Sequence, residues 1–201
     1  MKKYAFTVIM LLAFSLLSVA QEGMWLLNQI DDLGLREKGL EIETSEIYNT
    51  EKPALYNAIV QLGGGTASFV SPEGLIITNH HVAYGALQRA SSAENDYITN
   101  GFLAATKEKE IQAPGYQARV LQEMKDVTEE IRKAGKGIDY PLEKDQKINE
   151  KIKKMKTSME KGGDDIEVRI AEMFNGKQYM LFVYKVFKDV RIVYAPPSSI
   201  G

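Results

Sequence analysis

Two histidines stand side by side in the segment TNHHV (residues 78–82), and the 201-residue chain contains no others. An imidazole titrates near neutrality and its second ring nitrogen can be oriented by a carboxylate, so histidine is the usual general base for a serine nucleophile. A base of this kind must be held on a rigid element. Two interpretations are open at this point: one imidazole performs chemistry, or both are polar residues that cap a strand end.

Zinc binding is another chemistry that a histidine pair brings to mind. Neighbouring residues on a strand point to opposite faces of the sheet, so the two rings cannot easily share one ion. The chain also has no cysteine, no third histidine and no HExxH pattern. We therefore expect no metal site.

The elements that must position the histidines are short runs rich in β-branched residues. They span Ala58–Leu62, Thr66–Val70 and Leu75–Thr78, and the glycines 63–65 and the turn SPEG (residues 71–74) separate them. Proline at the first central position of that turn, with glycine two residues later, predicts a tight hairpin. These strands would deliver the histidines to a strand end.

The second half of the chain changes from helical to β character. Asp126 and Glu129 form a predicted capping pair, and a lysine-rich helix is predicted over Leu142–Lys161. Its apolar residues form one narrow stripe on a cylinder that otherwise faces solvent: Ile148, Ile152, Met155 and Met159.

A hairpin is predicted around Asn175-Gly176, between strands at Glu167–Phe174 and Gln178–Val186, and a further strand at Val190–Tyr194. The fold class expected is mainly β, one β-barrel with a charged helical insertion at about 126–162.

Composition and the amino-terminal residues limit the classes of function that this chain can have. The net charge of -2 gives no general attraction for nucleic acid, and the absence of cysteine excludes disulfides. Residues 1–20 begin MKK, continue with an apolar run and end in SVA, the pattern of a secretory signal peptide. The apolar run is shorter than the roughly 20 residues that a membrane span needs. We expect an exported protein of the periplasm or cell surface, with no stable membrane span after cleavage.

The string GGGTASFVSPEGLIITNHHV (residues 63–82) resembles the segment around the catalytic histidine of trypsin-like serine proteases. The double histidine followed by AYGALQ (83–88) resembles the bacterial dipeptidyl-peptidase 7 and 11 family of serine exopeptidases. QEGMWLLNQI (21–30) and DVRIVYAPPSSIG (189–201) are similar to that family's mature amino terminus and to the segment before its catalytic aspartate.

The resemblance implies the first β-barrel of a trypsin-like (chymotrypsin-fold) double-barrel peptidase, with residues 21–201 as an incomplete catalytic domain. It implies that His81 is the general base, because the trypsin-type base directly precedes the position held here by Val82. The family commonly has cysteine there and another in the preceding glycine segment, where this chain has Val82 and Gly65-Thr66.

A serine protease also needs an acid, a nucleophilic serine and an oxyanion hole. The chain has no GxSG or GxSxG string, and the pairs Ser91-Ser92 and Ser198-Ser199 stand in turn-like context. Asp126 is better explained as a helix cap, and Asp96 has no supporting context. We expect the triad's aspartate and serine beyond Gly201, and this chain alone to be inactive.

The function expected of the full-length protein is that of a serine-type dipeptidyl-peptidase, which removes dipeptides from the free amino end of oligopeptides and needs no cofactor. A homodimer of the full-length protein is compatible with the resemblance. Two alternatives are a non-catalytic exported binding module with a relict protease barrel, and a trypsin-like endopeptidase.

Overall fold

The computed structural model describes residues 23–200, so the predicted signal peptide lies outside the described residues. The chain divides into two units, one ending at Thr44 and the other starting at Ser45. The first contains the 3₁₀ helix η1, Leu27–Leu33, which ends at Gly34 with a φ of 56°. No residue of η1 is buried, and Trp25 just before it is 53% exposed.

Two short helical turns come next, and three strands follow that include the predicted hairpin. The turns are α2 (Thr44–Ile47) and η2 (Leu55–Ala58), and the strands are β1 (Ile59–Leu62), β2 (Gly65–Phe69) and β3 (Ile76–Thr78). β2 pairs antiparallel with both neighbours. In the turn before β3, Val70 N donates a hydrogen bond to Leu75 O at 2.9 Å. Gly74 in this turn has a φ of 88°, a backbone conformation that favours glycine.

These three strands join a six-stranded antiparallel sheet in the order β3-β2-β1-β6-β8-β7. The longer strands are β6 (Ala118–Asp126), β7 (Ile166–Met173) and β8 (Gln178–Phe187). The predicted hairpin around Asn175-Gly176 is confirmed, with Met173 opposite Gln178 across the turn.

The prediction of a closed β-barrel is not confirmed, because the sheet described here stays open, with β3 and β7 as its edges. Two small sheets, β4 (Phe102–Leu103) with β10 (Tyr194–Ala195) and β5 (Ile111–Gln112) with β9 (Arg191–Ile192), accompany it. The chain segments of β6 and β8 separate where that pairing ends and pair again as β5 and β9. Between the two pairings, Ala113 N donates to Val190 O at 2.8 Å. Neither small sheet pairs with β3 or β7, so both edges of the six-stranded sheet lack a neighbouring strand within residues 23–200.

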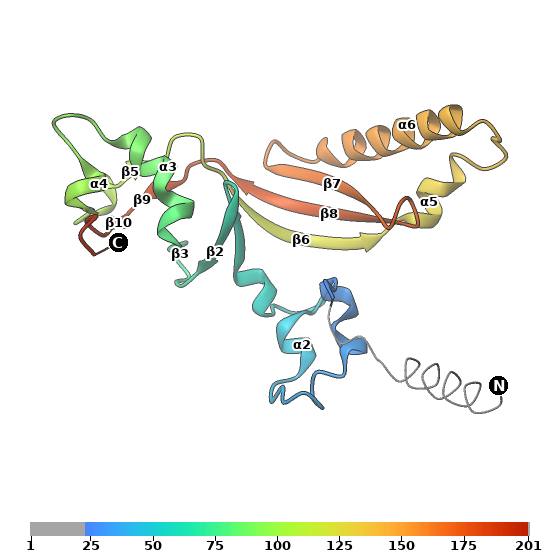
Figure 1. The fold of residues 1–201 in the computed structure, drawn as a ribbon, viewed down its shortest axis with the longest axis horizontal. Coiled ribbons are helices and arrows are strands. Elements are labelled where there is room, and N and C mark those ends of the chain that lie inside the picture. Colours follow the sequence, from blue (N-terminus) through green and yellow to red (C-terminus); the bar gives the residue numbers. More distant parts are fainter. Residues whose placement is uncertain (1–22, 201) are drawn as a thin grey trace, which may run out of the picture. The chain divides into compact units, whose positions relative to one another are not determined.

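Two helices connect β6 to β7: α5 (Thr128–Lys133) and α6 (Pro141–Glu160). α6 runs alongside the β7–β8 hairpin (Figure 1), and its predicted apolar stripe packs against the sheet. The resulting cluster contains Val127, Ile131, Ile148, Val168, Tyr179 and Leu181. The helical segment therefore covers the sheet and supplies part of its core.

A separate apolar cluster lies where β1, β2 and β6 meet, and it consists of Val60, Leu62, Ala67, Ala118 and Val120. The next helix, α3 (His80–Ala90), contributes Val82 to its border. After α3 follow the short helices α4 (Tyr97–Asn100) and η3 (Lys107–Lys109). No helix among residues 23–200 is long and apolar enough to cross a membrane.

Candidate active site

The histidine pair lies in the first turn of α3, not at the strand end that the sequence predicted. β3 ends at Thr78, Asn79 is the N-cap with extended backbone, and α3 begins at His80. The carbonyl of Asn79 accepts hydrogen bonds from Val82 N at 3.0 Å and Ala83 N at 3.3 Å. Successive residues on a helix point about 100° apart, so the two rings still diverge and share no ion. Among the described residues, no group of three or more potential ligands could hold a metal.

The two imidazoles differ in their surroundings. His80 is half-buried, and its ring meets the Tyr84 ring edge-on at a centroid distance of 5.7 Å. His81 is exposed, and neither ring forms a hydrogen bond within residues 23–200. An exposed imidazole on a helix turn can accept a proton from a group brought to it, whereas His80 is engaged in packing. The assignment of His81 as the base stays a prediction.

The residue after His81 is held by contacts from outside its helix. A Cβ built on Gly65 would lie 2.5 Å from one Val82 methyl carbon and 2.8 Å from the other, so Val82 fits only because position 65 is glycine. The Tyr116 hydroxyl donates to Val82 O at 2.6 Å. The family resemblance implies one cysteine at the position of Val82 and another in the segment Gly65-Thr66, and Gly65 and Val82 lie in contact. Sequence reasoning missed Tyr116, which no local pattern distinguishes.

The candidate acids of the sequence have structural roles. Asp126 accepts from Thr128 N at 2.8 Å and from Gln178 Nε2 at 3.0 Å, and these hydrogen bonds hold the pKa of its carboxyl below the ordinary value. Asp96 caps α4 by accepting from Thr99 N at 2.9 Å. The side chain of Thr99, and then its backbone N–H, lower the pKa of Asp96 by hydrogen bonding to its carboxylate. Neither carboxylate bonds to a histidine.

The candidate serines are similarly engaged or exposed. The Ser91 hydroxyl donates to Leu87 O at 2.8 Å, the Ser92 hydroxyl donates to Glu94 at 2.9 Å, and Ser198 and Ser199 are exposed. Within the part of the chain that the structure describes, His81 therefore has neither a carboxylate nor a serine as a partner.

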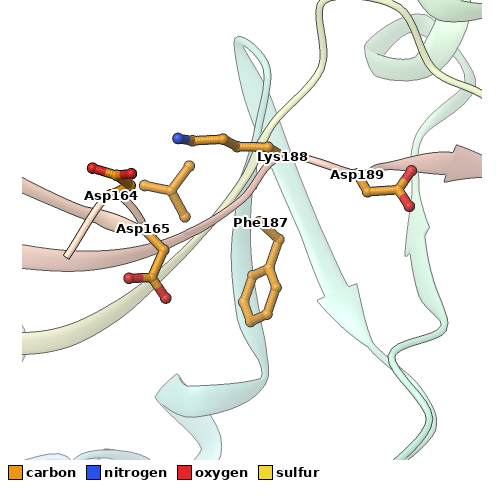
Figure 2. Close-up of a pocket in the computed structure, with 6 residues that line it drawn as sticks. Asp164, Asp165, Phe187, Lys188 and Asp189 are labelled. Atoms are coloured by element: carbon orange, nitrogen blue, oxygen red, sulfur yellow. The ribbon is translucent and has the colours of Figure 1, made fainter.

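A surface hollow of about 390 Å³ lies elsewhere, between the α6–β7 turn and the segment that joins β8 to β9. In Figure 2, Lys188 extends toward the side of Asp164, whereas Phe187 points away from it. Two of the three carboxylates that line it have cationic partners: Asp165 pairs with Lys185 at 3.6 Å and Asp189 with Arg191 at 2.8 Å. No histidine lines this hollow, so it is separate from the candidate site.

Comparisons with known proteins agree on one family. The family model described as Peptidase S46 matches residues 20–201. Dipeptidyl-peptidase 7 of Porphyromonas gingivalis is 39% identical over 96% of this chain, and the Asp/Glu-specific dipeptidyl-peptidase of Flavobacterium psychrophilum is 38% identical over 95%. The match covers 27% of each of these relatives, so the chain spans about a quarter of their length.

A solved structure gives the same result. Porphyromonas endodontalis DPP11 in complex with the dipeptide Arg-Asp superposes with a TM-score of 0.78 at 33% identity, over 89% of this chain and 27% of that one. The relatives are named dipeptidyl-peptidases, which disfavours the binding-module and endopeptidase alternatives. Because the family model covers nearly the whole sequence, this chain belongs to the peptidase S46 family.

Proposed function

We propose that the protein containing this segment is a serine-type dipeptidyl-peptidase that releases dipeptides from the free amino end of oligopeptides. The observation that carries the proposal is the exposed His81 in a chain of the peptidase S46 family. Its helix turn is held by contacts from Gly65 on β2 and from Tyr116 in the link before β6. The whole protein would be exported, with residues 1–20 as the signal peptide, and would act in the periplasm or at the cell surface.

In the proposed reaction His81 accepts the proton of the serine nucleophile as that oxygen attacks the scissile carbonyl, and later protonates the leaving amine. The serine, the acid that orients His81 and the oxyanion hole would come from outside the described residues. The open sheet would then be the first half of a trypsin-like catalytic domain. The contact of Gly65 with Val82 supports this assignment of the fold, because the resemblance implies one cysteine at position 82 and another in the segment Gly65-Thr66.

The substrates would be oligopeptides with an unblocked amino terminus. The relatives include both dipeptidyl-peptidase 7 and Asp/Glu-specific dipeptidyl-peptidases, at 39% and 38% identity, and solved relatives hold dipeptides such as Arg-Asp and Arg-Glu. The near-equal identities favour neither subgroup. A panel of dipeptide reporter substrates with acidic or hydrophobic second residues would assign the preference.

The test compares His81→Ala with His80→Ala in the complete protein. Hydrolysis of an unblocked peptide should fall about 10⁶-fold in His81→Ala, because loss of a triad base leaves only oxyanion and binding contributions. His80→Ala removes only a packing contact with Tyr84 and should keep most of the activity. An amino-acetylated peptide is the substrate control and should not be cleaved. Full activity of His81→Ala would refute the proposal.

A further inference from the structure

A tyrosine from a distant segment clamps the turn that carries His81. Tyr116 lies in the link between β5 and β6, and its hydroxyl donates to the carbonyl oxygen of Val82 at 2.6 Å. Val82 directly follows His81 in the first turn of α3. The hydrogen bond therefore ties the helix turn of the candidate base to the start of the central strand β6.

The tyrosine is itself held in place. The guanidinium of Arg89, on α3, lies over the Tyr116 ring at 5.4 Å, and Arg89 Nε donates to Pro114 O at 2.8 Å. A Cβ built on Gly63 would lie 3.1 Å from the ring, so the β1–β2 turn closes against it. Tyr116 also packs on the apolar cluster at β1, β2 and β6. A ring held on several sides can fix the position of its hydroxyl.

Three groups of Val82 are thereby fixed at once. Its amide donates to Asn79 O at 3.0 Å, its side chain fills the space beside Gly65, and its carbonyl accepts from Tyr116. With the Val82 amide and the Val82 carbonyl both held, neither of the two peptide units that flank Val82 can tilt without breaking one of these contacts, and the first of them joins Val82 to His81. The orientation of the His81 imidazole is then left to its own two side-chain torsions.

We propose that Tyr116 is a positioning residue for His81. The inference rests on the proposed function, because a precisely held imidazole matters only if it transfers protons. A base must stay within about 0.5 Å of its productive position, and a displacement of about 1 Å can cost 10²-fold in rate. Tyr116 touches no reacting atom and acts through the backbone of Val82.

The test is Tyr116→Phe in the complete protein, with kcat and KM for an unblocked peptide expressed per folded molecule. Loss of one hydrogen bond of this kind should lower kcat about tenfold and leave KM unchanged. Arg89→Met, which frees the ring without removing the hydroxyl, should lower kcat by a smaller factor. Tyr140→Phe is the matched control, because Tyr140 is 64% exposed, lies at the start of α6 and should keep full kcat.

Other outcomes overturn the inference. If Tyr116→Phe lowers the melting temperature but keeps kcat per folded molecule, the hydroxyl is merely structural. If KM rises while kcat is unchanged, the tyrosine serves substrate binding instead. His81→Ala is measured in parallel. If His81→Ala is inactive and Tyr116→Phe is fully active, only this inference is refuted. If His81→Ala is active, the proposed function is refuted.

Discussion

At the scale of single residues, the contact of Gly65 with Val82 shows how a missing side chain can shape a site. β2 begins at Gly65, and the Val82 methyl groups occupy the space that any Cβ there would need. Val82 is thus pressed against the strand while Tyr116 holds its carbonyl. Because His81 precedes Val82, a change in volume at position 65 reaches the candidate base through one peptide unit.

Gly65→Ala should therefore harm both stability and catalysis. The new methyl group would lie 2.5 Å from a Val82 carbon, and overpacking of this kind costs about 1–3 kcal/mol of unfolding free energy. We expect a lower melting temperature by calorimetry and a reduced kcat in the complete protein. Gly64→Ala is the control, since a Cβ at Gly64 meets nothing within 4 Å. Equal stability of the two variants would contradict the steric explanation.

At the scale of elements, an ion-pair network ties three strands of the sheet together. Glu167 on β7 accepts from Arg119 of β6 and from Arg169, each at 2.7 Å. Arg169 also donates to Gln61 of β1 at 3.1 Å and lies over the Tyr184 ring at 5.3 Å. Burial alone would raise the pKa of Glu167, but the two arginines outweigh it and hold that pKa below its ordinary value.

Glu167→Gln should cost stability in a pH-dependent way. Because the folded-state pKa is depressed, the carboxylate contributes stability above its unfolded pKa of about 4.3 and loses it as the pH falls through the folded value. We expect the variant to be about 1 kcal/mol less stable in urea at pH 7, a gap that narrows below about pH 4. Glu150→Gln, from an exposed pair with Lys147, should change little at either pH. A gap that widens in acid would contradict the ion-pair explanation.

At the scale of the whole molecule, the unit from Ser45 onward contains two separate clusters of buried apolar residues. One cluster joins α5 and α6 to β7 and β8, and the other joins β1, β2 and β6 beside α3. The histidine turn borders the second cluster through Val82. The helical segment thus stabilises the far part of the sheet, and the candidate site depends on the packing of the first strands.

Metal removal is a prediction for the whole protein. The proposed chemistry transfers a proton between a serine and a histidine and calls for no metal ion. We expect prolonged dialysis against EDTA to leave kcat and KM for an unblocked peptide unchanged. Loss of activity that added zinc restores would show that a metal takes part.

Much of the local structure could be predicted because it depends on neighbours in sequence. Pro72 and Gly74 predict the turn before β3, Asn175-Gly176 predicts the β7–β8 hairpin, and the stripe headed by Ile148 predicts the buried side of α6. The histidine motif itself indicated the family that the comparisons show. Each of these signals is complete within about twenty residues.

Other features depended on the tertiary structure. The sequence by itself determined the β2–β3 and β7–β8 hairpins, the lysine-rich helix and the histidine motif, through backbone preferences and hydrophobic periodicity. Only the tertiary structure decided that the described sheet stays open, that the histidines begin a helix, and that Tyr116 meets Val82 from 34 residues away. Contacts between distant segments depend on how whole elements pack, and no local periodicity encodes that packing.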